Sequence, residues 1–398
     1  MRAVTRPTDP GEPVVEPGRP LVAFASPRRT LWGDEGVALR IGLPAPWVDH
    51  VGLVAEVLDG LRGDDAPTGP GRGPVAFGAL PYDRGAAAEL VVPRVVRGRD
   101  HEGAHWVTTV DDGSAAPAPG PVPPAPGEVT IRSVRDPADW CDDVAAATKR
   151  IVDGDLTKVV LARELELRAD TSFDPARVFA RLRAAAPHAM CFCVDGFVGA
   201  SPELLVSRVG DVVRAHPMAG TTPRTGDPQV DQRRAAELLG SSKNRVEHQI
   251  TIDMVHETLL PWCSYLDAEP EPSIVAAGPV QHLATMVEGR LSHPAPSVLE
   301  LVAALHPTPA VGGWPRTPAL ELQARLEGTD RGRYAGPVGW VDAGGNGSWA
   351  VGIRSVELSG RAARLFAGVG VVADSDPVAE LEETRAKAQA TLGALLRL

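Results

Sequence analysis

The sequence predicts an α+β fold, and three observations favour this class. Short apolar segments of strand length, bounded by turn residues, fill the N-terminal third of the chain. Two later stretches, 137–153 and 377–398, have the apolar spacing of amphipathic helices. The strand-like runs are followed by helical runs rather than alternating with them one by one, as a regular βαβ repeat would require.

A segment rich in proline, alanine and glycine divides the chain. Residues 113–127 read GSAAPAPGPVPPAPG, which can build neither a helix nor a paired strand, so a linker or long surface loop is expected there. It separates a strand-rich N-terminal part, 1–112, from a longer part, 128–398. The predicted strands are 36–41, 75–80, 89–96, 157–168, 190–198, 204–208, 336–341, 349–358 and 363–369, and the predicted helices are 47–61, 137–153, 241–260 and 377–398.

Composition and charge exclude several classes of partner. The 398 residues are 43% hydrophobic and 23% charged, and the formal net charge of -11 disfavours nucleic acid and anionic membranes as the main partner. The N-terminus lacks a signal-peptide core and no run of about 18 apolar residues occurs, so a cytoplasmic protein is expected. The cysteines lack zinc-type spacing and are expected to be buried thiols.

Lysine is almost absent, which draws attention to the few that occur. The chain contains only Lys149, Lys158, Lys243 and Lys387 among 40 basic residues. A surface cation can be either lysine or arginine, but an amine that accepts a proton cannot be arginine, whose guanidinium stays charged. Lys158 opens a strand-like run, and Lys387 follows Glu380 and Glu383 in the C-terminal helix.

Three glutamates are also candidates for chemistry, and each has a simpler structural interpretation. Glu383 and Lys387 have the spacing of an i,i+4 ion pair, which on spacing alone is most simply a solvated helix face. Glu247 with His248 could ligate a metal or belong to a polar helix surface. Glu203 begins an apolar strand after a turn, where a solvated carboxylate and a general acid are the alternatives. The loop 305–315 is too apolar for disorder, so a functional loop is expected.

Taken in order, a series of sequence blocks resembles the chorismate-utilising enzymes, and among them the isochorismate synthases. The N-terminal blocks ASPRRTL at 25 and GALPYD at 78 also resemble the entry segments of isochorismate synthases, where anthranilate and aminodeoxychorismate synthases differ. The later blocks are KVVLAR at 158, GASPELL at 199, AGTTPR at 219, KNRVEH at 243, HLATMVEG at 282, HPTPAVGGWP at 306, YAGPVGW at 334, IRSVEL at 353, LFAGVG at 365 and ELEETRAK at 380.

The resemblance implies a fold and a set of site residues. The fold would be the chorismate-binding, anthranilate synthase component I-like α+β fold, with large antiparallel sheets flanked by helices and 128–398 as the catalytic domain. Glu247 and Glu383 would hold Mg²⁺, whose preference for hard carboxylate oxygens they meet. Lys158 would be the general base and Glu203 the general acid, which must stay protonated. The implied substrate-binding residues are Gly220, Thr221, His282, Ala310, Tyr334, Arg354, Gly368 and Lys387.

The implied reaction adds water at C2 of chorismate while the C4 hydroxyl leaves, which yields isochorismate. Aminating relatives carry glutamine where this chain has Lys158 and depend on a glutaminase, so water as nucleophile and no glutaminase subunit are expected. Salicylate synthase, which also eliminates pyruvate, is the alternative. Salicylate synthases resemble the aminating members in having threonine where this chain has Ala310, so Ala310 disfavours this alternative. Tyr334 favours it, because salicylate synthases resemble this chain in having tyrosine there.

An inactive chorismate-fold binding protein is a further alternative, disfavoured because the chemically important residues are retained together. The resemblance implies a monomer. The isochorismate synthases that the chain resembles serve menaquinone, siderophore or salicylate synthesis.

Overall fold

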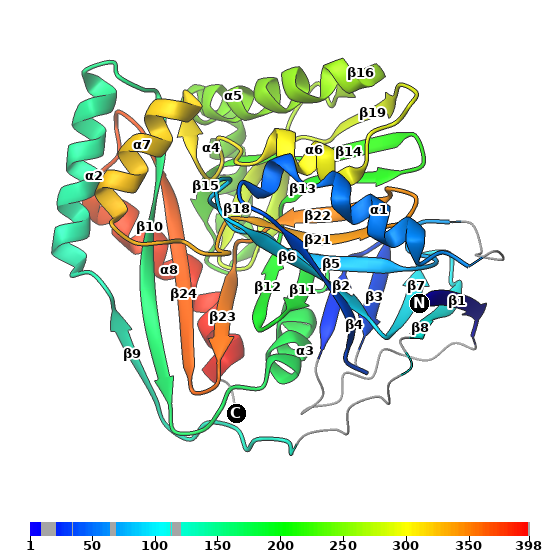
Figure 1. The fold of residues 1–398 in the computed structure, drawn as a ribbon. Helices are drawn as coiled ribbons and strands as arrows, with labels where there is room; N and C mark the ends of the chain where they lie inside the picture. Colours follow the sequence, from blue (N-terminus) through cyan, green and yellow to red (C-terminus); the bar gives the residue numbers. More distant parts are fainter. Residues whose placement is uncertain (9–20, 34, 64–68, 112, 114–120, 397–398) are drawn as a thin grey trace.

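Two large antiparallel sheets form the centre of the molecule. The computed structural model describes residues 1–8, 21–33, 35–63, 69–111, 113 and 121–396. The first large sheet, sheet A, has 12 strands, and the second, sheet B, has nine. A third sheet of three strands, sheet C, stands beside them (Figure 1). Every pairing in these sheets is antiparallel, as the fold class predicted.

The strands of sheet A come from both parts of the chain. They are β1 Arg2–Pro7, β8 His105–Asp111, β7 Val95–Asp100, β3 Arg29–Gly33, β2 Val22–Ala25, β11 Met190–Val194, β12 Phe197–Ser201, β23 Ser355–Ser359, β24 Ala362–Val371, β10 Lys158–Ala169, β20 Gly313–Trp314 and, paired with β10, β9 Val129–Ser133.

Sheet B is likewise shared between the two parts of the chain. It contains β16 Cys263–Ala268, β19 Val287–Leu291, β14 Val212–His216, β13 Leu204–Val209, β22 Gly347–Val351, β21 Pro337–Asp342, β5 Val75–Ala79, β6 Ala88–Pro93 and β4 Val37–Leu43. Sheet C consists of β15 Met218–Pro223, β18 Val280–Ala284 and β17 Ser273–Ala277.

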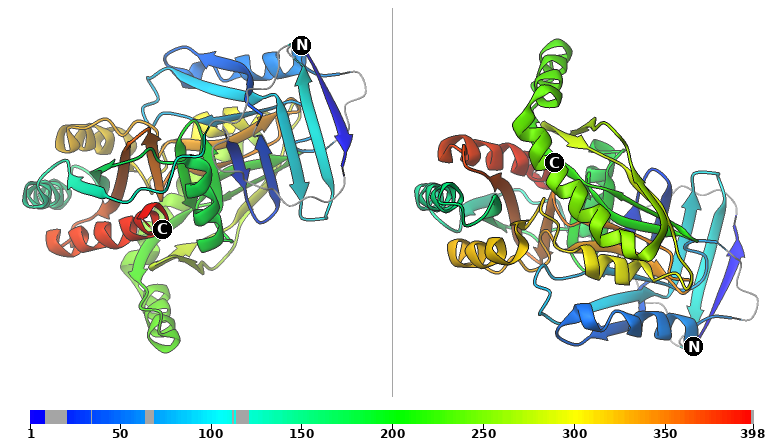
Figure 2. Two further views of the ribbon diagram at one scale, coloured as in Figure 1. Left: turned by 90° about the horizontal axis from the view of Figure 1, so that it is seen from below. Right: turned by 90° about the horizontal axis from the view of Figure 1, so that it is seen from above.

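Helices cover the outer faces of both large sheets. The helices are α1 Gly52–Gly60, α2 Pro137–Val152, α3 Pro175–Ala185, α4 Pro228–Gly240, α5 Ser242–Leu259, α6 Val298–Leu305, α7 Arg316–Glu327 and α8 Pro377–Leu396, with short 3-10 turns at Trp47–Asp49 and Leu260–Trp262. Helices α2, α3, α7 and α8 pack on sheet A, whereas α1, α5 and α6 pack on sheet B. Helix α4 projects from the body (Figure 2).

A buried aromatic core joins the two large sheets. Phe24 and Phe192 from sheet A meet Phe77 and Trp340 from sheet B, and all four side chains are almost inaccessible to solvent. The order is therefore helices, sheet A, sheet B and helices, and burial on both sheet faces explains why many strands are apolar throughout.

Three predicted strands are each divided in two. Segment 190–198 is the hairpin β11–β12, turned at Asp195 and Gly196, both with positive φ. Segments 89–96 and 349–358 each leave one large sheet and enter the other, as β6–β7 and β22–β23. The single-strand predictions were wrong there because an apolar run that changes sheets keeps the same hydrophobic pattern as one uninterrupted strand.

Two smaller predictions also need correction. The apolar spacing of the predicted helix 377–398 includes Val378, but this residue is 63% exposed because it lies in the first turn, before α8 reaches the core. Loop 305–315 contains a two-residue strand, β20, which pairs with the start of β10. Within the segment predicted as a linker, residues 114–120 lie outside the described residues, and Gly113 and 121–127 form neither helix nor strand.

Candidate active site

The candidate site lies where the chain passes from one sheet to another. Glu203 stands between β12 of sheet A and β13 of sheet B, and Arg354 stands between β22 of sheet B and β23 of sheet A. Gly220 and His282 belong to sheet C, whose strands β15 and β18 directly follow and precede strands of sheet B. Backbone that leaves one sheet for another exposes side chains to the space between them, and a cavity forms there.

Lys158 reaches this cavity from the first position of β10. Its residue is only 4% exposed, and its Nζ donates a hydrogen bond of 2.6 Å to Oε1 of Glu247 on α5. Room for the lysine comes from Gly370 on the paired strand β24, because a Cβ at that glycine would lie 2.7 Å from Cε of Lys158. Lys158 is thus a buried cation held by one carboxylate.

Glu203 is a buried carboxyl group with a raised pKa. The residue is 3% exposed, and its backbone N–H donates to Oγ of Ser201 at 3.2 Å, which fixes the turn between the strands. Burial raises the pKa of Glu203 to about 8, although the charge of Lys158 and a hydrogen bond from the Met218 backbone both act in the opposite direction. The carboxyl group is therefore mostly protonated at neutral pH, the state that a general acid requires.

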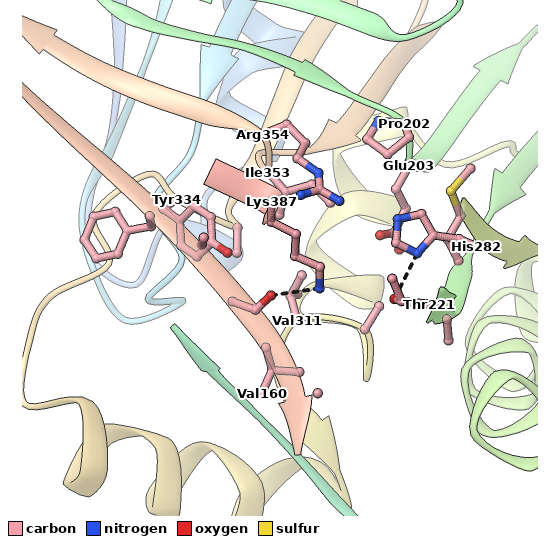
Figure 3. A pocket seen from close by; sticks show the side chains of 18 of the residues that line it. Val160, Pro202, Glu203, Thr221, His282, Val311, Tyr334, Ile353, Arg354 and Lys387 are labelled. Atoms are coloured by element: carbon pink, nitrogen blue, oxygen red, sulfur yellow. Dashed lines mark hydrogen bonds between the residues drawn. The ribbon is translucent and has the colours of Figure 1, made fainter. Parts of the chain in front are cut away.

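His282 is held as a neutral imidazole. Its Nδ1 lies 3.2 Å from the Gly220 carbonyl oxygen and 3.1 Å from Oγ1 of Thr221. Burial, helped by the charges of Arg354 and Lys387, lowers the pKa of His282 to about 3. Since a carbonyl only accepts, the Nδ1–H donates to Gly220, and Nε2 is left as an acceptor on the cavity side (Figure 3).

Arg354 carries its guanidinium into the cavity from a strained backbone position. Its φ is 53°, a left-handed conformation that is uncommon for residues other than glycine and that clusters at functional sites. Its carbonyl accepts a hydrogen bond from Ala200 N–H at 3.1 Å, which anchors the sheet crossing. The guanidinium makes no hydrogen bond or ion pair with any of the described residues, and it points into the centre of the cavity (Figure 3).

Tyr334 and Gly368 form the wall beside Arg354. The Tyr334 ring stacks on Phe366 with centroids 5.1 Å apart, and a hydrogen bond links its hydroxyl to the backbone of Gly368. Burial raises the pKa of Tyr334 to about 12, so the hydroxyl stays protonated. A Cβ at residue 368 would lie 3.0 Å from that hydroxyl, so a larger residue there would require the tyrosine ring to shift.

Three carboxylates gather at one side of the cavity. Glu383 pairs with Lys387 at 2.6 Å, and Nζ of Lys387 also donates to the Gly368 carbonyl at 3.0 Å. Burial raises the pKa of Glu380, and the negative charges of Glu383 and Glu247 raise it further. The spacing of α8 indicated Glu380 as a neighbour of Glu383, but its place in this acidic group was not predicted.

The carboxylates of this acidic group suit Mg²⁺ as ligands, but they do not form a complete metal site. No group of three or more His, Cys, Asp or Glu side chains among the described residues is arranged to hold a metal ion by itself. Mg²⁺ commonly uses one or two carboxylates and takes its remaining oxygens from water and substrate. Glu247 and Glu383 supply hard oxygens, and because the charges of both act on Glu380, a cation would relieve repulsion within this acidic group.

These residues line one cavity with about 780 Å³ of space free of protein atoms, including its opening to solvent. All the predicted site residues line it except Glu383, which contacts it through Lys387. Ala310 and Val311, from loop 305–315, form part of the wall. Among the lining residues that were not predicted are Val160, Pro202, Met218, Arg331, Ile353 and Phe366.

Comparison with known proteins matches residues 105–396 to the family described as chorismate binding enzyme. The chain belongs to the chorismate binding enzymes. It is 40% identical over 338 residues to isochorismate synthase DhbC of Bacillus subtilis, with 81% of each chain covered. It is 32% identical over 380 residues to the vibriobactin-specific isochorismate synthase of Vibrio cholerae, covering 93% of this chain and 90% of the relative.

Solved structures give the same fold. The menaquinone-specific isochorismate synthase MenF of Escherichia coli superposes with a TM-score of 0.83 at 24% identity, covering 100% of this chain and 94% of that one. Anthranilate synthase component I of Streptococcus pneumoniae has a TM-score of 0.69 at 22% identity, covering 98% and 92%. The predicted family and the predicted α+β fold are confirmed.

Within the part of the chain that the structure describes, no helix has both the length and the apolar character needed to cross a bilayer.

Proposed function

We propose that this chorismate binding enzyme is a Mg²⁺-dependent isochorismate synthase. The reaction adds water to C2 of chorismate while the C4 hydroxyl leaves. The observation that carries the proposal is the presence, in one cavity, of a buried lysine, a buried protonated carboxyl group and an arginine without a protein partner. Relatives at 40% and 32% identity that are named isochorismate synthases support it.

Glu203 is the proposed general acid. Hydroxide is a poor leaving group at neutral pH, so the C4 oxygen must receive a proton as its bond to carbon breaks. With a pKa of about 8, Glu203 carries that proton at pH 7, and this pKa is close enough to pH 7 for the proton to be released.

Lys158 is the proposed general base that takes a proton from water. Its Nζ donates to Glu247, and the amine must be in its neutral form, with a free lone pair, before it can accept a proton from water. Because the nucleophile is water rather than ammonia, we expect the enzyme to act without a glutaminase subunit.

The remaining residues of the cavity orient the substrate. Arg354, with its unused donors, binds the enolpyruvyl carboxylate, assisted by Gly368 and Tyr334. Gly220, Thr221 and Lys387 line the region of the ring carboxylate, and neutral His282 offers Nε2 as an acceptor without adding charge.

Glu247 and Glu383 are the proposed Mg²⁺ ligands. When bound, Mg²⁺ would supply positive charge beside the ring carboxylate. The lysines that now pair with both glutamates would then be free to face the substrate.

Salicylate synthase is the second candidate, and Tyr334 favours it. That enzyme forms isochorismate and then eliminates pyruvate. Ala310 argues against it, because its methyl group brings no hydroxyl to the cavity wall.

Incubation of the purified protein with chorismate and Mg²⁺, followed by chromatographic separation of the products, tests the proposal. Isochorismate in equilibrium with chorismate supports it. Stoichiometric pyruvate and salicylate would instead establish the second candidate, and unchanged chorismate would contradict both.

Chelation tests the metal separately. Enzyme treated with a chelator should lose activity and recover it with added Mg²⁺, and Glu247→Gln and Glu383→Gln should be inactive but folded. Full turnover by chelated enzyme would show that Mg²⁺ is not required.

A further inference from the structure

A second arginine borders the cavity, and its hydrogen bonds are directed to the protein frame. Arg331 donates to both carboxylate oxygens of Glu327, from Nε at 2.8 Å and from Nη2 at 2.5 Å. The two side chains are only 3% and 4% exposed. A buried arginine with a bidentate carboxylate partner is a fixed unit, because breaking the pair leaves a buried charge.

Arg331 also reaches two backbone carbonyls that belong to different walls of the cavity. Its Nη1 donates to Val311 O at 2.9 Å, and its Nη2 donates to Val160 O at 3.0 Å. Val160 lies two residues after Lys158 on β10, and Val311 directly follows Ala310 in the loop. The guanidinium therefore ties the strand of the proposed base to the loop that faces the substrate.

Side chains of α7 complete this connection. Strand β9 pairs with one edge of β10 from Leu165 to Ala169, and at the start of this edge the strand partner β20 reaches only the first two residues. Beyond them, Gln323 Nε2 donates to Val160 O at 2.6 Å and to Val311 O at 3.3 Å, and Glu327 Oε1 accepts from Ala162 N–H at 2.7 Å. Three side chains thus perform the hydrogen bonding that a neighbouring strand would otherwise provide.

Arg331 contacts a third wall through its flat face. Its Cζ lies 4.6 Å from the ring centroid of Tyr82 and 5.8 Å from that of Tyr334. Tyr82 in turn donates to Gln323 Oε1 at 2.8 Å. The position of Tyr334, beside the proposed carboxylate site, is consequently coupled to the same guanidinium.

We propose that Arg331, supported by Glu327 and Gln323, is a positioning residue that sets the distance between β10 and the Ala310–Val311 segment. This inference rests on the proposed isochorismate synthase function. Arg331 acts through the backbone of Val160 and Val311 and does not bind substrate. The reaction depends on placing water and the C4 hydroxyl between fixed groups, and a displacement of about 1 Å can reduce a rate on the order of 10²-fold.

Arg331→Lys is the test variant, because lysine keeps the positive charge for Glu327 but cannot make the forked contacts to two carbonyls. The chain offers a matched control in Arg333, which also bonds one carboxylate, Glu357, and two carbonyls, those of Val194 and Asp195. Arg333 does not line the cavity. Arg333→Lys should therefore show the stability effect of losing such contacts without the effect on catalysis.

We expect kcat for isochorismate formation to fall on the order of 10²-fold in Arg331→Lys and less than about threefold in Arg333→Lys, with similar melting temperatures. The fall should be partly shared with Ala310→Thr, so the double variant Ala310→Thr/Arg331→Lys should be non-additive while Ala310→Thr/Arg333→Lys is additive. If Arg331→Lys does not fold, Gln323→Met leaves the ion pair intact and should still lower kcat about tenfold.

The inference would be overturned if the two lysine variants had equal kcat and KM, or if the double variants were additive. If Arg331→Lys does not fold, a Gln323→Met enzyme with unchanged kcat would overturn it instead. These results require an active wild type. A wild type that forms no isochorismate contradicts the proposed function itself, and with it the inference, and is recognised before any variant is made.

Discussion

Two arginines border the same cavity, and they differ in what their donors contact. Arg331 makes four hydrogen bonds to the protein, including two to one carboxylate. Arg354 makes none with the described residues and stands on a backbone with φ of 53°. Both guanidinium groups are charged at any physiological pH. On the side of the cavity formed by β10 and α7, the arginine's hydrogen bonds are therefore made to the protein. At the sheet crossing, Arg354 instead presents its donors to a ligand.

The comparison shows how to separate structural from functional charges in a pocket. A buried charge with complete partners is part of the fold, and a desolvated charge without partners is maintained for something that is not part of the chain. Desolvation lowers the pKa of Arg354, which means that burial disfavours its charged form and that the unpaired charge does not stabilise the fold. In the proposed function, the enolpyruvyl carboxylate of the substrate supplies the missing partner.

The acidic side of the cavity is intermediate between these cases. Glu247 and Glu383 have partners, but the partners are Lys158 and Lys387, which also line the cavity. In the proposed function these pairs exchange when Mg²⁺ and substrate bind, unlike the bidentate pair of Arg331 and Glu327, whose side chains are only 3% and 4% exposed.

The largest effect is expected from the acid and the base. Lys158→Ala and Glu203→Gln should each reduce kcat by about 10² to 10⁴, since general acid–base catalysis by one group typically contributes that much. Affinity for chorismate, measured by fluorescence titration, should change little. A variant that keeps more than about a tenth of wild-type kcat would exclude its residue from the proposed role.

Arg354 should affect binding rather than the fold. Arg354→Met removes hydrogen bonds to a carboxylate, each worth about 1.5 to 3 kcal/mol, so KM for chorismate should rise roughly ten- to a hundredfold. The melting temperature should stay the same or rise, because an unpaired charge is lost. Arg331→Met, which strands Glu327, should instead destabilise the fold by about 3 to 5 kcal/mol. If both variants lost stability equally, the distinction between the two arginines would be wrong.

The pH dependence follows from Glu203. Its pKa is raised from 4.5 to about 8, so the acid is present below pH 8 and is lost above it. Activity should fall about tenfold between pH 7 and pH 9, and the residual activity of Glu203→Gln should lack this fall. The same shift lowers the stability of the folded protein as pH rises from about 4.5 to about 8, because the unfolded chain releases this proton first. A wild-type profile that is flat up to pH 9 would contradict the assignment.

Much of this site could be predicted from sequence, because its residues stand in short blocks whose order identifies the family. Lysine scarcity pointed to Lys158 and Lys387 without any relative. The strands and helices with a clear apolar period, such as β10 and α2, also lie where they were predicted.

The rest could not be predicted for a physical reason. The sheet crossing at Arg354 leaves no mark in the hydrophobic pattern, since the strands on both sides are largely buried, and the turn before Glu203 was predicted without the change of sheet that follows it. Arg331 is one of 36 arginines in the sequence, and nothing in its neighbourhood shows that two distant carbonyls, those of Val160 and Val311, converge on it. Such contacts exist only once the loop, α7 and β10 have come together.

The smallest change tests the fate of the product. Ala310 lies on the loop that Arg331 holds against β10, and its methyl group offers the cavity no hydroxyl. Bound isochorismate should therefore be released, and the wild type should approach the same chorismate–isochorismate ratio from either side with pyruvate only in trace amounts. Ala310→Thr adds a hydroxyl at the cavity wall, and we expect more pyruvate or a several-fold lower rate of isochorismate formation, with a stability change within about 0.5 to 1.5 kcal/mol. Ala310→Val adds similar volume without the hydroxyl and is the control. If threonine and valine had the same effect on the pyruvate-to-isochorismate ratio, volume rather than the hydroxyl would decide the outcome, and Ala310 would no longer distinguish the two candidate functions.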